Sequence, residues 1–458
     1  MNKYALIAPN PAISHLRTVH TMLGEYDYNY IKTDNAEELP AILADETYDG
    51  FNVATPFKTE VIKYVDELSD DAKRIGAVTT IKRLPDGRLY GYNTDIDGFR
   101  HTVQGFARER KCIVIGTGGA ARACVYALED IGASEILMVS RDPERARERL
   151  GDGFQIIGFD RLHLHYDAQV IINATPIGQL PDIEHSPLTD QRMTVRMFSQ
   201  LELAVDMILN PYRTKFLQDA RRLTGCHTKS GLDMVIIQAI ESRFLWEDVR
   251  IEDDERDMLV GKIKRKILEE QLNVIAVGMP GSGKTTIFRR YAYELGLKFI
   301  DSDEETEKLM GDSAEKVLSS GEAGIEYFRA MEHLAVKEIC KNQNSVIATG
   351  GGTVLNPINR DLLRSNGIIV YVKRPLDMLD VKGRPISINV GVSELFGERD
   401  RIYHRMSDMT IVNSRIFGGK KKATGEGNTY NYELKGFVYY IARKVQHYLN
   451  DLADNQWT

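Results

Sequence analysis

The chain has 458 residues and a formal net charge of −7. A hydrophobic fraction of 43% with 27% charged residues excludes a mainly disordered, fibrous or collagen-like chain, and about 150 residues per domain predicts about three domains. The acidic balance leaves no global basic surface, so we expect neither nucleic acid nor an anionic membrane as a partner. The four cysteines lie far apart in the sequence, which argues against a disulfide framework and fits a reducing compartment. Without a leader-like or membrane-length apolar run, we expect a cytoplasmic protein, and the oligomeric state stays open.

Short apolar, β-branched runs alternate with longer amphipathic stretches along the chain. Such runs, separated by helix-length spacers, are typical of parallel sheets that helices cover on both faces. Two of the runs lead directly into glycine-rich turns, at Gly116 and Gly278. Because one compact domain rarely carries two nucleotide turns, we expect two catalytic units of the α/β class. The six strand candidates are 113–115, 136–139, 170–172, 274–277, 346–348 and 368–372.

The joint between these units is expected within residues 247–271, which contain an acidic run and then a basic run with few apolar residues. This composition predicts a charged, solvated helical linker at residues 251–270, and an ordinary surface helix of one domain is the alternative. A second unusual stretch, the glycine- and lysine-rich residues 418–427, predicts a surface loop. Phosphate binding by its lysines is the functional alternative there.

The first glycine-rich turn reads Gly-Thr-Gly-Gly-Ala-Ala-Arg at residues 116–122 and follows a predicted strand. Its glycines permit a tight turn whose backbone N–H groups approach a pyrophosphate at a helix N-terminus. The next strand ends before Ser140 and Arg141, which favour a 2′-phosphate and hence NADP, whereas the carboxylate of Asp142 would repel that phosphate. The predicted cofactor-binding residues are Gly116, Gly118, Gly119, Ala120, Ser140, Arg141 and Arg145.

Two segments upstream carry a lysine and an aspartate that a dinucleotide site could use. They read Asn-Val-Ala-Thr-Pro-Phe-Lys at 52–58 and Gly-Tyr-Asn-Thr-Asp at 91–95. A lone lysine or aspartate is more often a surface residue than a catalyst. Reducing a carbonyl, however, requires a proton for the oxygen as well as a hydride, and a pair formed by Lys58 and Asp95 can hold that proton in place.

With these segments, residues 1 to about 250 resemble shikimate dehydrogenase. The family carries N-V-T-x-P-[FHY]-K, G-A-V-N-T, G-x-N-T-D, G-x-G-G-[AS]-x-[RK] and a final G-L-x-M-L-x-x-Q helix, and this chain has the corresponding segments in the same order. The resemblance implies an α/β substrate-binding domain at 1–98, completed by a helix at 230–250, and a Rossmann NADP-binding domain at 99–229. It implies reduction of 3-dehydroshikimate to shikimate with NADPH. By the same resemblance Lys58 and Asp95 are the catalytic pair, and the substrate-binding residues are Ser14, Thr55, Asn93, Asp95 and Gln238.

Two positions depart from the family pattern. Thr79 stands in place of the asparagine of G-A-V-N-T, and the N-terminal serine pair that binds the substrate carboxylate in the family is reduced to Ser14. Arg17 or Thr18 is the alternative carboxylate ligand, and an arginine would bind bidentately. The alternatives to a full shikimate dehydrogenase are therefore a weak or binding-only module, or a dehydrogenase for quinate or a related acid.

The second glycine-rich turn, Gly-Met-Pro-Gly-Ser-Gly-Lys-Thr at 278–285, is a complete G-x-x-x-x-G-K-[ST] loop between a predicted strand and a predicted helix. In such a loop backbone N–H groups cradle the phosphates, Lys284 reaches the β- and γ-phosphates, and Thr285 binds Mg²⁺. The expected cofactors are ATP and Mg²⁺. The predicted nucleotide-binding residues are Gly281, Gly283, Lys284, Thr285 and Thr286.

The motifs after this loop resemble shikimate kinase over residues 272 to about 415. They are Asp-x-Asp at 301–303, Phe-Arg-x-x-Glu at 328–332, Thr-Gly-Gly-Gly at 349–352, Gly-Arg-Pro at 383–385 and Arg-x-x-x-Tyr at 399–403. The resemblance implies a P-loop kinase domain with a parallel sheet at 271–458. It implies that shikimate, the product of the first unit, is phosphorylated to shikimate 3-phosphate.

This second resemblance also implies roles for individual residues. Asp303 would bind and deprotonate the acceptor hydroxyl, Asp301 would lie near Mg²⁺, and Arg384 would come from a closing lid to neutralise the transferring phosphoryl group together with Lys284. Arg401 is a rival for the carboxylate-binding role of Arg399. The shikimate-binding residues would be Asp303, Arg329, Gly350, Gly351, Gly352 and Arg399.

Overall fold

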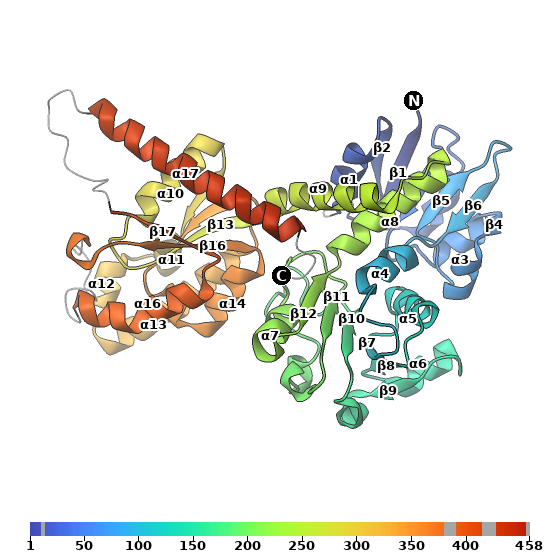
Figure 1. Ribbon diagram of the computed structural model, residues 1–458, viewed down its shortest axis with the longest axis horizontal. Helices are drawn as coiled ribbons and strands as arrows, with labels where there is room; N and C mark the ends of the chain where they lie inside the picture. Colours follow the sequence, from blue (N-terminus) through green and yellow to red (C-terminus); the bar gives the residue numbers. More distant parts are fainter. Residues whose placement is uncertain (11–13, 380–390, 415–426, 455–458) are drawn as a thin grey trace.

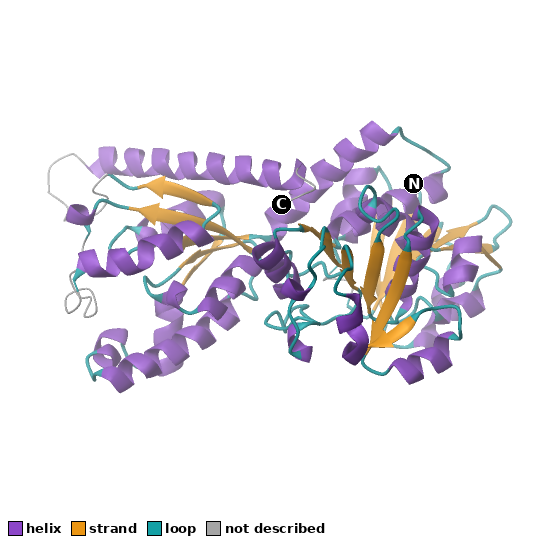
Figure 2. Ribbon diagram, turned by 60° about the horizontal axis from the view of Figure 1, so that its bottom comes forward, coloured by secondary structure: helices purple, strands orange, loops and turns teal. Residues whose placement is uncertain are grey.

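The structure is a computed structural model that describes residues 1–10, 14–379, 391–414 and 427–454. Three β-sheets, each with its own helices, follow one another along the chain (Figure 1). Helices lie against the faces of the sheets (Figure 2), as buried, continuously apolar strands require. No helix in the described ranges has the length and apolar character needed to cross a membrane.

The first sheet is mixed. Its strands are β1 (Lys3–Ala8), β2 (Asp27–Lys32), β3 (Gly50–Val53), β4 (Glu67–Leu68), β5 (Thr80–Arg83) and β6 (Leu89–Tyr92), and its helices are α1 (Leu16–Leu23), α2 (Leu39–Leu43), α3 (Asp70–Ile75) and α4 (Asp95–Val103). The strand order is β2-β1-β3-β5-β6-β4. β1 is parallel to β2 and β3, whereas β5 is antiparallel to β3 and β6. The carboxyl ends of β1 and β3 therefore lie at one edge, where the segments that carry Ser14 and Lys58 begin.

The second sheet is parallel throughout, with the order β12-β11-β10-β7-β8-β9. Its strands are β7 (Lys111–Ile115), β8 (Glu135–Ser140), β9 (Ile156–Gly158), β10 (Val170–Asn173), β11 (Leu203–Asp206) and β12 (His227–Ser230), and its helices are α5 (Gly119–Ile131), α6 (Pro143–Leu150) and α7 (Lys215–Thr224). Helix α8 (Leu232–Glu247) then returns to pack against α4 and α1 of the first unit.

The third sheet is also parallel, with the order β14-β15-β13-β16-β17. Its strands are β13 (Asn273–Val277), β14 (Lys298–Asp301), β15 (Ser345–Ala348), β16 (Gly367–Lys373) and β17 (Met409–Val412), and its helices are α10 (Lys284–Leu295), α11 (Ser302–Met310), α12 (Ala314–Leu318), α13 (Glu322–Ile339), α14 (Pro357–Ser365), α16 (Val392–Met406) and α17 (Gly427–Asp454). All six strand candidates are confirmed, as parts of β7, β8, β10, β13, β15 and β16. The α/β fold class expected from the sequence is confirmed with them.

Helix α9 (Asp253–Gln271) occupies the predicted linker, so the segment is helical as expected, but it is not solvated on all sides. Its few apolar residues recur at helical spacing and form one stripe, and Val260, Ile263, Ile267 and Leu268 are at most 6% exposed. They belong to one hydrophobic cluster with residues of α8, β13 and α17. Residue composition alone predicts a solvated helix, whereas the spacing of these residues buries one face. Helix α9 thus packs against helices of both halves, including α1, α8 and α17 (Figure 1).

Candidate active sites

Lys58 and Asp95 form an ion pair. Lys58 lies in the turn after β3, and Asp95 is the first residue of α4. The Lys58 Nζ lies 2.7 Å from the Asp95 Oδ2, and the side chains are 25% and 6% exposed. A partly buried carboxylate at hydrogen-bond distance fixes the direction of the ammonium group. The pair predicted from two distant segments is therefore assembled in the fold, with Lys58 open to one side.

Asn93 supplies a polar atom beside this pair. Its Nδ2 donates to the Ala77 carbonyl oxygen at 2.9 Å, while its buried Oδ1 has no hydrogen-bond partner in the described part of the chain. A buried acceptor without a partner is costly and is available to a ligand hydroxyl. The substituted Thr79 is fully buried, and its Oγ1 accepts from the Thr94 backbone N–H at 2.7 Å. Thr79 therefore positions the segment that carries Asn93 and Asp95.

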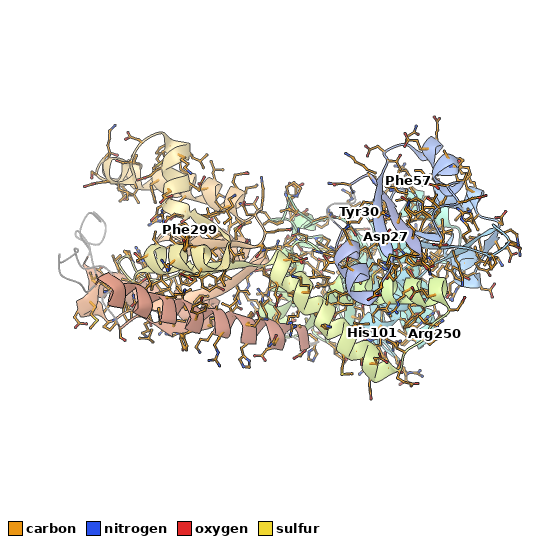
Figure 3. All side chains as sticks on the ribbon, turned by 90° about the horizontal axis from the view of Figure 1, so that it is seen from above. Asp27, Tyr30, Phe57, His101, Arg250 and Phe299 are labelled. Carbon is orange, nitrogen blue, oxygen red and sulfur yellow. The ribbon has the colours of Figure 1, made fainter. Side chains whose placement is uncertain are left out.

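Ser14 and Thr55 follow the carboxyl ends of β1 and β3, and Gln238 lies on α8. The Ser14 Oγ accepts from the Leu16 N–H at 3.2 Å, Thr55 is exposed in the turn after β3, and Gln238 is buried on α8. Among the described residues no hydrogen bond joins these three side chains to the Lys58–Asp95 pair. Figure 3 labels Tyr30 and Phe57 in this unit.

Tyr30 connects Ser14 with the alternative carboxylate ligand. Its hydroxyl donates to the Ser14 carbonyl oxygen at 3.1 Å, and the Arg17 guanidinium lies 5.0 Å from the centre of its ring. Arg17 is exposed, so its charge is available to a ligand. The structure thus places Arg17 next to Ser14.

The first glycine-rich turn borders a cavity of about 500 Å³ at the carboxyl ends of β7 and β8. Gly116 has φ +121°, a conformation that favours glycine. A Cβ added to Gly118 would meet no atom within 4 Å, so the space at the start of α5 is open. Gly119 and Ala120 form the first turn of α5, where N–H groups and the helix dipole favour an anion. The turn fits the pyrophosphate of a dinucleotide.

The contacts of Asp142 in the wall of this cavity bear on whether its carboxylate would repel a 2′-phosphate. Its Oδ1 accepts from the Arg145 N–H at 3.1 Å and caps α6, while the Asp142 N–H donates to the Ser140 Oγ at 3.1 Å. The carboxylate is therefore engaged by the helix terminus. Arg141 and Arg145 both line the cavity and are exposed. The positive wall suits a phosphate more than a ribose hydroxyl.

Arg149 is a lining residue that the sequence reasoning missed. Its Nη2 donates to the Thr117 carbonyl oxygen at 2.6 Å and to the Thr117 Oγ1 at 2.9 Å, which ties α6 to the glycine-rich turn. The available signal was its spacing of four residues from Arg145, which places both on one helix face.

The second glycine-rich turn, between β13 and α10, borders a cavity of about 440 Å³. Lys284 is 7% exposed, and its Nζ donates to the carbonyl oxygens of Gly278 and Met279 at 2.8 and 3.0 Å. The Thr285 Oγ1 donates to the Asp301 Oδ2 at 2.9 Å. The other predicted nucleotide-binding residues that line this cavity are Gly281, Gly283 and Thr286.

Asp303 lies across the same cavity from the loop. Its N–H donates to the Asp301 Oδ1 at 3.0 Å, which caps α11. The surrounding protein removes part of its hydration, and with the nearby carboxylates of Asp301 and Glu332 this raises the pKa of Asp303 to about 6. Lys284 and Arg329 act in the opposite direction. A carboxyl group with such a pKa can exchange a proton near neutral pH.

The three consecutive glycines after β15 are required by close approach. A Cβ on Gly350 would lie 2.3 Å from the Asp303 Oδ1, and one on Gly352 would lie 2.2 Å from the Arg329 Nη2. A Cβ on Gly351 would lie 2.5 Å from Pro280 of the nucleotide loop. Any side chain there would push the functional groups apart, so the glycines keep the cavity narrow.

Two arginines line the cavity beside these glycines. The Arg329 Nη1 donates at 2.7 Å to Glu332, whose other oxygen accepts from the Thr353 Oγ1. Arg399 is buried and lines the cavity, whereas the rival Arg401 is exposed and absent from its lining. The geometry therefore favours Arg399 over Arg401. Arg384 and residues 418–426 lie outside the described residues.

Two further residues hold the nucleotide loop and were missed from sequence. The Arg374 Nη1 donates to the Gly281 carbonyl oxygen at 3.1 Å, and the Asn413 Nδ2 donates to the Ser282 carbonyl oxygen at 2.8 Å. They directly follow β16 and β17. Because these strands are parallel to β13, their carboxyl ends lie at the same edge of the sheet as the nucleotide loop. That edge was the signal available in the sequence.

Among the described residues, the candidate metal ligands are the side-chain oxygens of Thr285 and Asp301. Within the described ranges no group of three or more His, Cys, Asp or Glu side chains forms a metal cage. Mg²⁺ bound with a nucleotide commonly takes only one or two protein oxygens besides phosphates and water. The Thr285 hydroxyl and the Asp301 carboxylate fit that mode.

Comparison with known proteins follows this division of the chain. A family model described as shikimate dehydrogenase substrate binding domain matches residues 12–81. One described as shikimate kinase matches residues 280–416. The shikimate dehydrogenase (NADP(+)) of Caldicellulosiruptor bescii is 34% identical over 270 residues, which cover 54% of this chain and 90% of that protein.

Solved structures resemble the same part of the chain. A chorismate mutase/shikimate 5-dehydrogenase fusion protein from Clostridium acetobutylicum has 33% identity and a TM-score of 0.53, and the match covers 58% of this chain and 98% of that one. Shikimate 5-dehydrogenase from Thermus thermophilus, solved with NADP(H) and shikimate, has 28% identity and a TM-score of 0.50, with 57% and 100% covered. The chain belongs to the shikimate dehydrogenase family and carries a shikimate kinase domain after its dehydrogenase part.

Proposed function

We propose that this chain is a bifunctional enzyme that reduces 3-dehydroshikimate to shikimate with NADPH and then phosphorylates shikimate to shikimate 3-phosphate with ATP and Mg²⁺. The proposal rests on one observation: a single chain holds two sites, and each has the charged residues that its reaction needs. Lys58 and Asp95 are paired at 2.7 Å in the first unit. Lys284 and Asp303 line one cavity in the third unit. The product of the first family's reaction is the substrate of the second.

In the reduction, the chain's own residues manage the proton. The turn at Gly116–Gly118 with Arg141 and Arg145 would hold NADPH, which would supply the hydride. Lys58 donates a proton to the carbonyl oxygen as it becomes a hydroxyl, and Asp95 keeps the ammonium group oriented. Asn93 accepts a hydrogen bond from a ring hydroxyl through its otherwise unpartnered Oδ1.

In the phosphoryl transfer, the residues of the third unit provide position and charge. ATP with Mg²⁺ supplies the phosphoryl group. Asp303 accepts the proton of the attacking hydroxyl, and Lys284 stabilises negative charge on the phosphate oxygens. Arg329 and Arg399 bind the carboxylate of the substrate, and the glycines at 350–352 leave room for its ring.

The test is an assay of the purified full-length chain with one substrate at a time. We expect NADPH oxidation with 3-dehydroshikimate, and ADP release with shikimate, ATP and Mg²⁺. Lys58→Ala should remove the first activity and spare the second, whereas Lys284→Ala should do the reverse. Lys63→Ala changes an exposed lysine on the same segment as Lys58 and serves as the matched control.

Each half of the proposal fails separately in this assay. Kinase activity without reduction of 3-dehydroshikimate would leave the first unit a binding module. Faster turnover of quinate than of shikimate in the reverse, NADP-dependent direction would make it a dehydrogenase for that acid. Reduction without ADP release would contradict the kinase half.

A further inference from the structure

A cavity of about 340 Å³ lies between the second and third units. Its walls come from α7 and β12 on one side, from α14 and α17 on the other, and from α9 between them. It shares no lining residue with the cavities at the two glycine-rich turns. It is thus separate from both candidate active sites, and its size falls within the range of small-molecule sites.

The lining of this cavity is strongly positive. It includes six lysine or arginine side chains and three aspartates, an excess of three positive charges. Asp361 pairs with Arg222 at 3.3 Å, and Asp408 lies 3.9 Å from Arg213. The whole chain has a net charge of −7, so the positive charge of this cavity contrasts with the rest of the molecule.

Two buried ammonium groups share one carboxylate in the interior. Lys264 of α9 and Asp233 of α8 approach to 3.0 Å, and Lys229 of β12, which donates to the Thr102 carbonyl oxygen at 2.6 Å, interacts with the same aspartate. Burial lowers the pKa of Lys229 to about 8, and Asp233 offsets part of this effect. A second negative charge in the cavity would stabilise both ammonium groups.

Two arginines that line the cavity have guanidinium groups available for a ligand. Arg364 is half-buried at the end of α14, and its guanidinium makes no hydrogen bond or ion pair with any residue in the described ranges. Arg221 is exposed on α7 and makes only a long hydrogen bond, 3.4 Å, to the Cys226 carbonyl oxygen. One arginine belongs to each half of the molecule, so an anion that binds both would bridge the two units.

We propose that this cavity binds a small organic phosphate monoester. Its phosphate group lies between Arg364 and Arg221 with Lys229 behind them, and its carbon skeleton lies against Leu217 and Leu452. A phosphate monoester carries nearly two negative charges at neutral pH, which matches the excess of positive charge better than a single carboxylate does. Arginine forks suit phosphate oxygens because they donate two parallel hydrogen bonds. Because the walls belong to both halves, the ligand stabilises their association.

The experiment measures thermal unfolding of the full-length chain with increasing inorganic phosphate, at an ionic strength held constant with chloride. Because the two glycine-rich turns are themselves predicted phosphate-binding sites, the background carries Lys284→Ala and Arg141→Ala. In this background we expect phosphate to raise the unfolding temperature still, since a ligand of the folded state stabilises it by mass action. Adding Arg221→Ala and Arg364→Ala should weaken phosphate binding roughly tenfold or more. Arg443→Ala, an exposed arginine on α17 outside the cavity lining, is the matched control.

Two outcomes overturn the proposal. One is a phosphate effect that disappears in the background variant, which would place all phosphate at the glycine-rich turns. The other is an effect that the Arg221→Ala and Arg364→Ala changes leave intact. Phenyl phosphate then tests the organic part of the ligand. It should bind more tightly than inorganic phosphate, and equal affinity would reduce the cavity to a site for the free ion.

Discussion

The two candidate active sites differ in the groups that surround their charged residues. In the dehydrogenase unit, Lys58 and Asp95 neutralise each other directly at 2.7 Å. In the kinase unit, Lys284 is held by two backbone carbonyl oxygens, and Asp303 faces Asp301 and Glu332, which help to raise its pKa to about 6.

The difference follows from what each reaction adds to its site. Carbonyl reduction needs one proton at a defined place, so a pair assembled in advance suffices. Phosphoryl transfer brings a highly charged nucleotide and a metal ion, so ligands as well as the protein set the charge balance of this site. The first site therefore pairs its two charges directly, whereas the second brings three carboxylates together, and Lys284 and Arg329 offset only part of their effect on the pKa of Asp303.

The largest expected effect is on the assembled pair. Lys58→Ala should lower kcat for 3-dehydroshikimate reduction by roughly 10²–10⁴-fold, because the proton donor acts mainly in the transition state. The Kd for NADPH, measured by fluorescence titration, should change little. A comparable loss of NADPH affinity would show that Lys58 serves binding, and the contrast between the sites would fail.

The kinase lysine should behave differently. Lys284→Ala should lower the phosphorylation rate by roughly 10²–10³-fold through lost stabilisation of phosphate charge. It should also weaken ATP binding, measured by calorimetry, because the lysine interacts with the bound nucleotide itself. A variant with lower kcat and unchanged ATP affinity would make the two sites alike.

The raised pKa of Asp303 predicts that the kinase loses activity as the pH becomes acidic. Its pKa is raised, so its proton-accepting form is lost as the pH falls through about 6. The kinase kcat/KM should be flat above about pH 7 and fall about tenfold per pH unit below about pH 6. The profile is measured at fixed ionic strength, and in Asp303→Asn the residual rate should lack this limb. Retention of the limb in that variant would assign it to another group.

The sequence predicted most of the fold and most of the site because both depend on local pattern. The strands were apolar runs, and the nucleotide turns were glycine patterns at their ends, so β7 and β13 were found with their loops. The pairing of Lys58 with Asp95 was anticipated only because the chemistry required a pair. Which atoms of Asn93 are engaged depends on Ala77, a neighbour that no local pattern specifies, whereas the partners of Asp142 are the nearby Ser140 and Arg145.

What the sequence could not provide comes from long-range packing. Composition predicted a solvated helix at 251–270, but α9 buries a stripe against α17, a helix that is distant in the chain. Arg364 and Arg221 lie in segments that no motif marks, and only the packing of the two halves places them at one cavity. Arg374 and Asn413 likewise reach the nucleotide loop from strands that follow it in the sequence.

The wall of the dinucleotide cavity gives a further test within the dehydrogenase half of the chain. Arg141 and Arg145 line the cavity beside Asp142, whose Oδ1 accepts the Arg145 N–H. Arg141→Ala should reduce the preference for NADPH over NADH about 10- to 30-fold, toward the low end of a charge-assisted contact because the side chain is exposed. The ratio of kcat/KM for the two cofactors measures it. A wild-type preference for NADH would contradict the assignment.

The smallest expected effect concerns Arg17, where the first unit departs from its family. The guanidinium lies over Tyr30, whose hydroxyl binds the Ser14 carbonyl oxygen, so Arg17 is close to the one remaining serine of the carboxylate motif. If Arg17 replaces the missing serine, Arg17→Ala should raise the KM for shikimate about tenfold, the lower end of what one charge-assisted hydrogen bond contributes. The KM for NADP should stay unchanged, and Ser14→Ala, measured in parallel, shows how the carboxylate is shared between the two residues. Because Tyr30 would keep its bond to Ser14 in either variant, an unchanged shikimate KM in Arg17→Ala cannot be attributed to a rearranged loop. It would mean that this part of the site, unlike the Lys58–Asp95 pair, leaves the charge of its substrate to solvent.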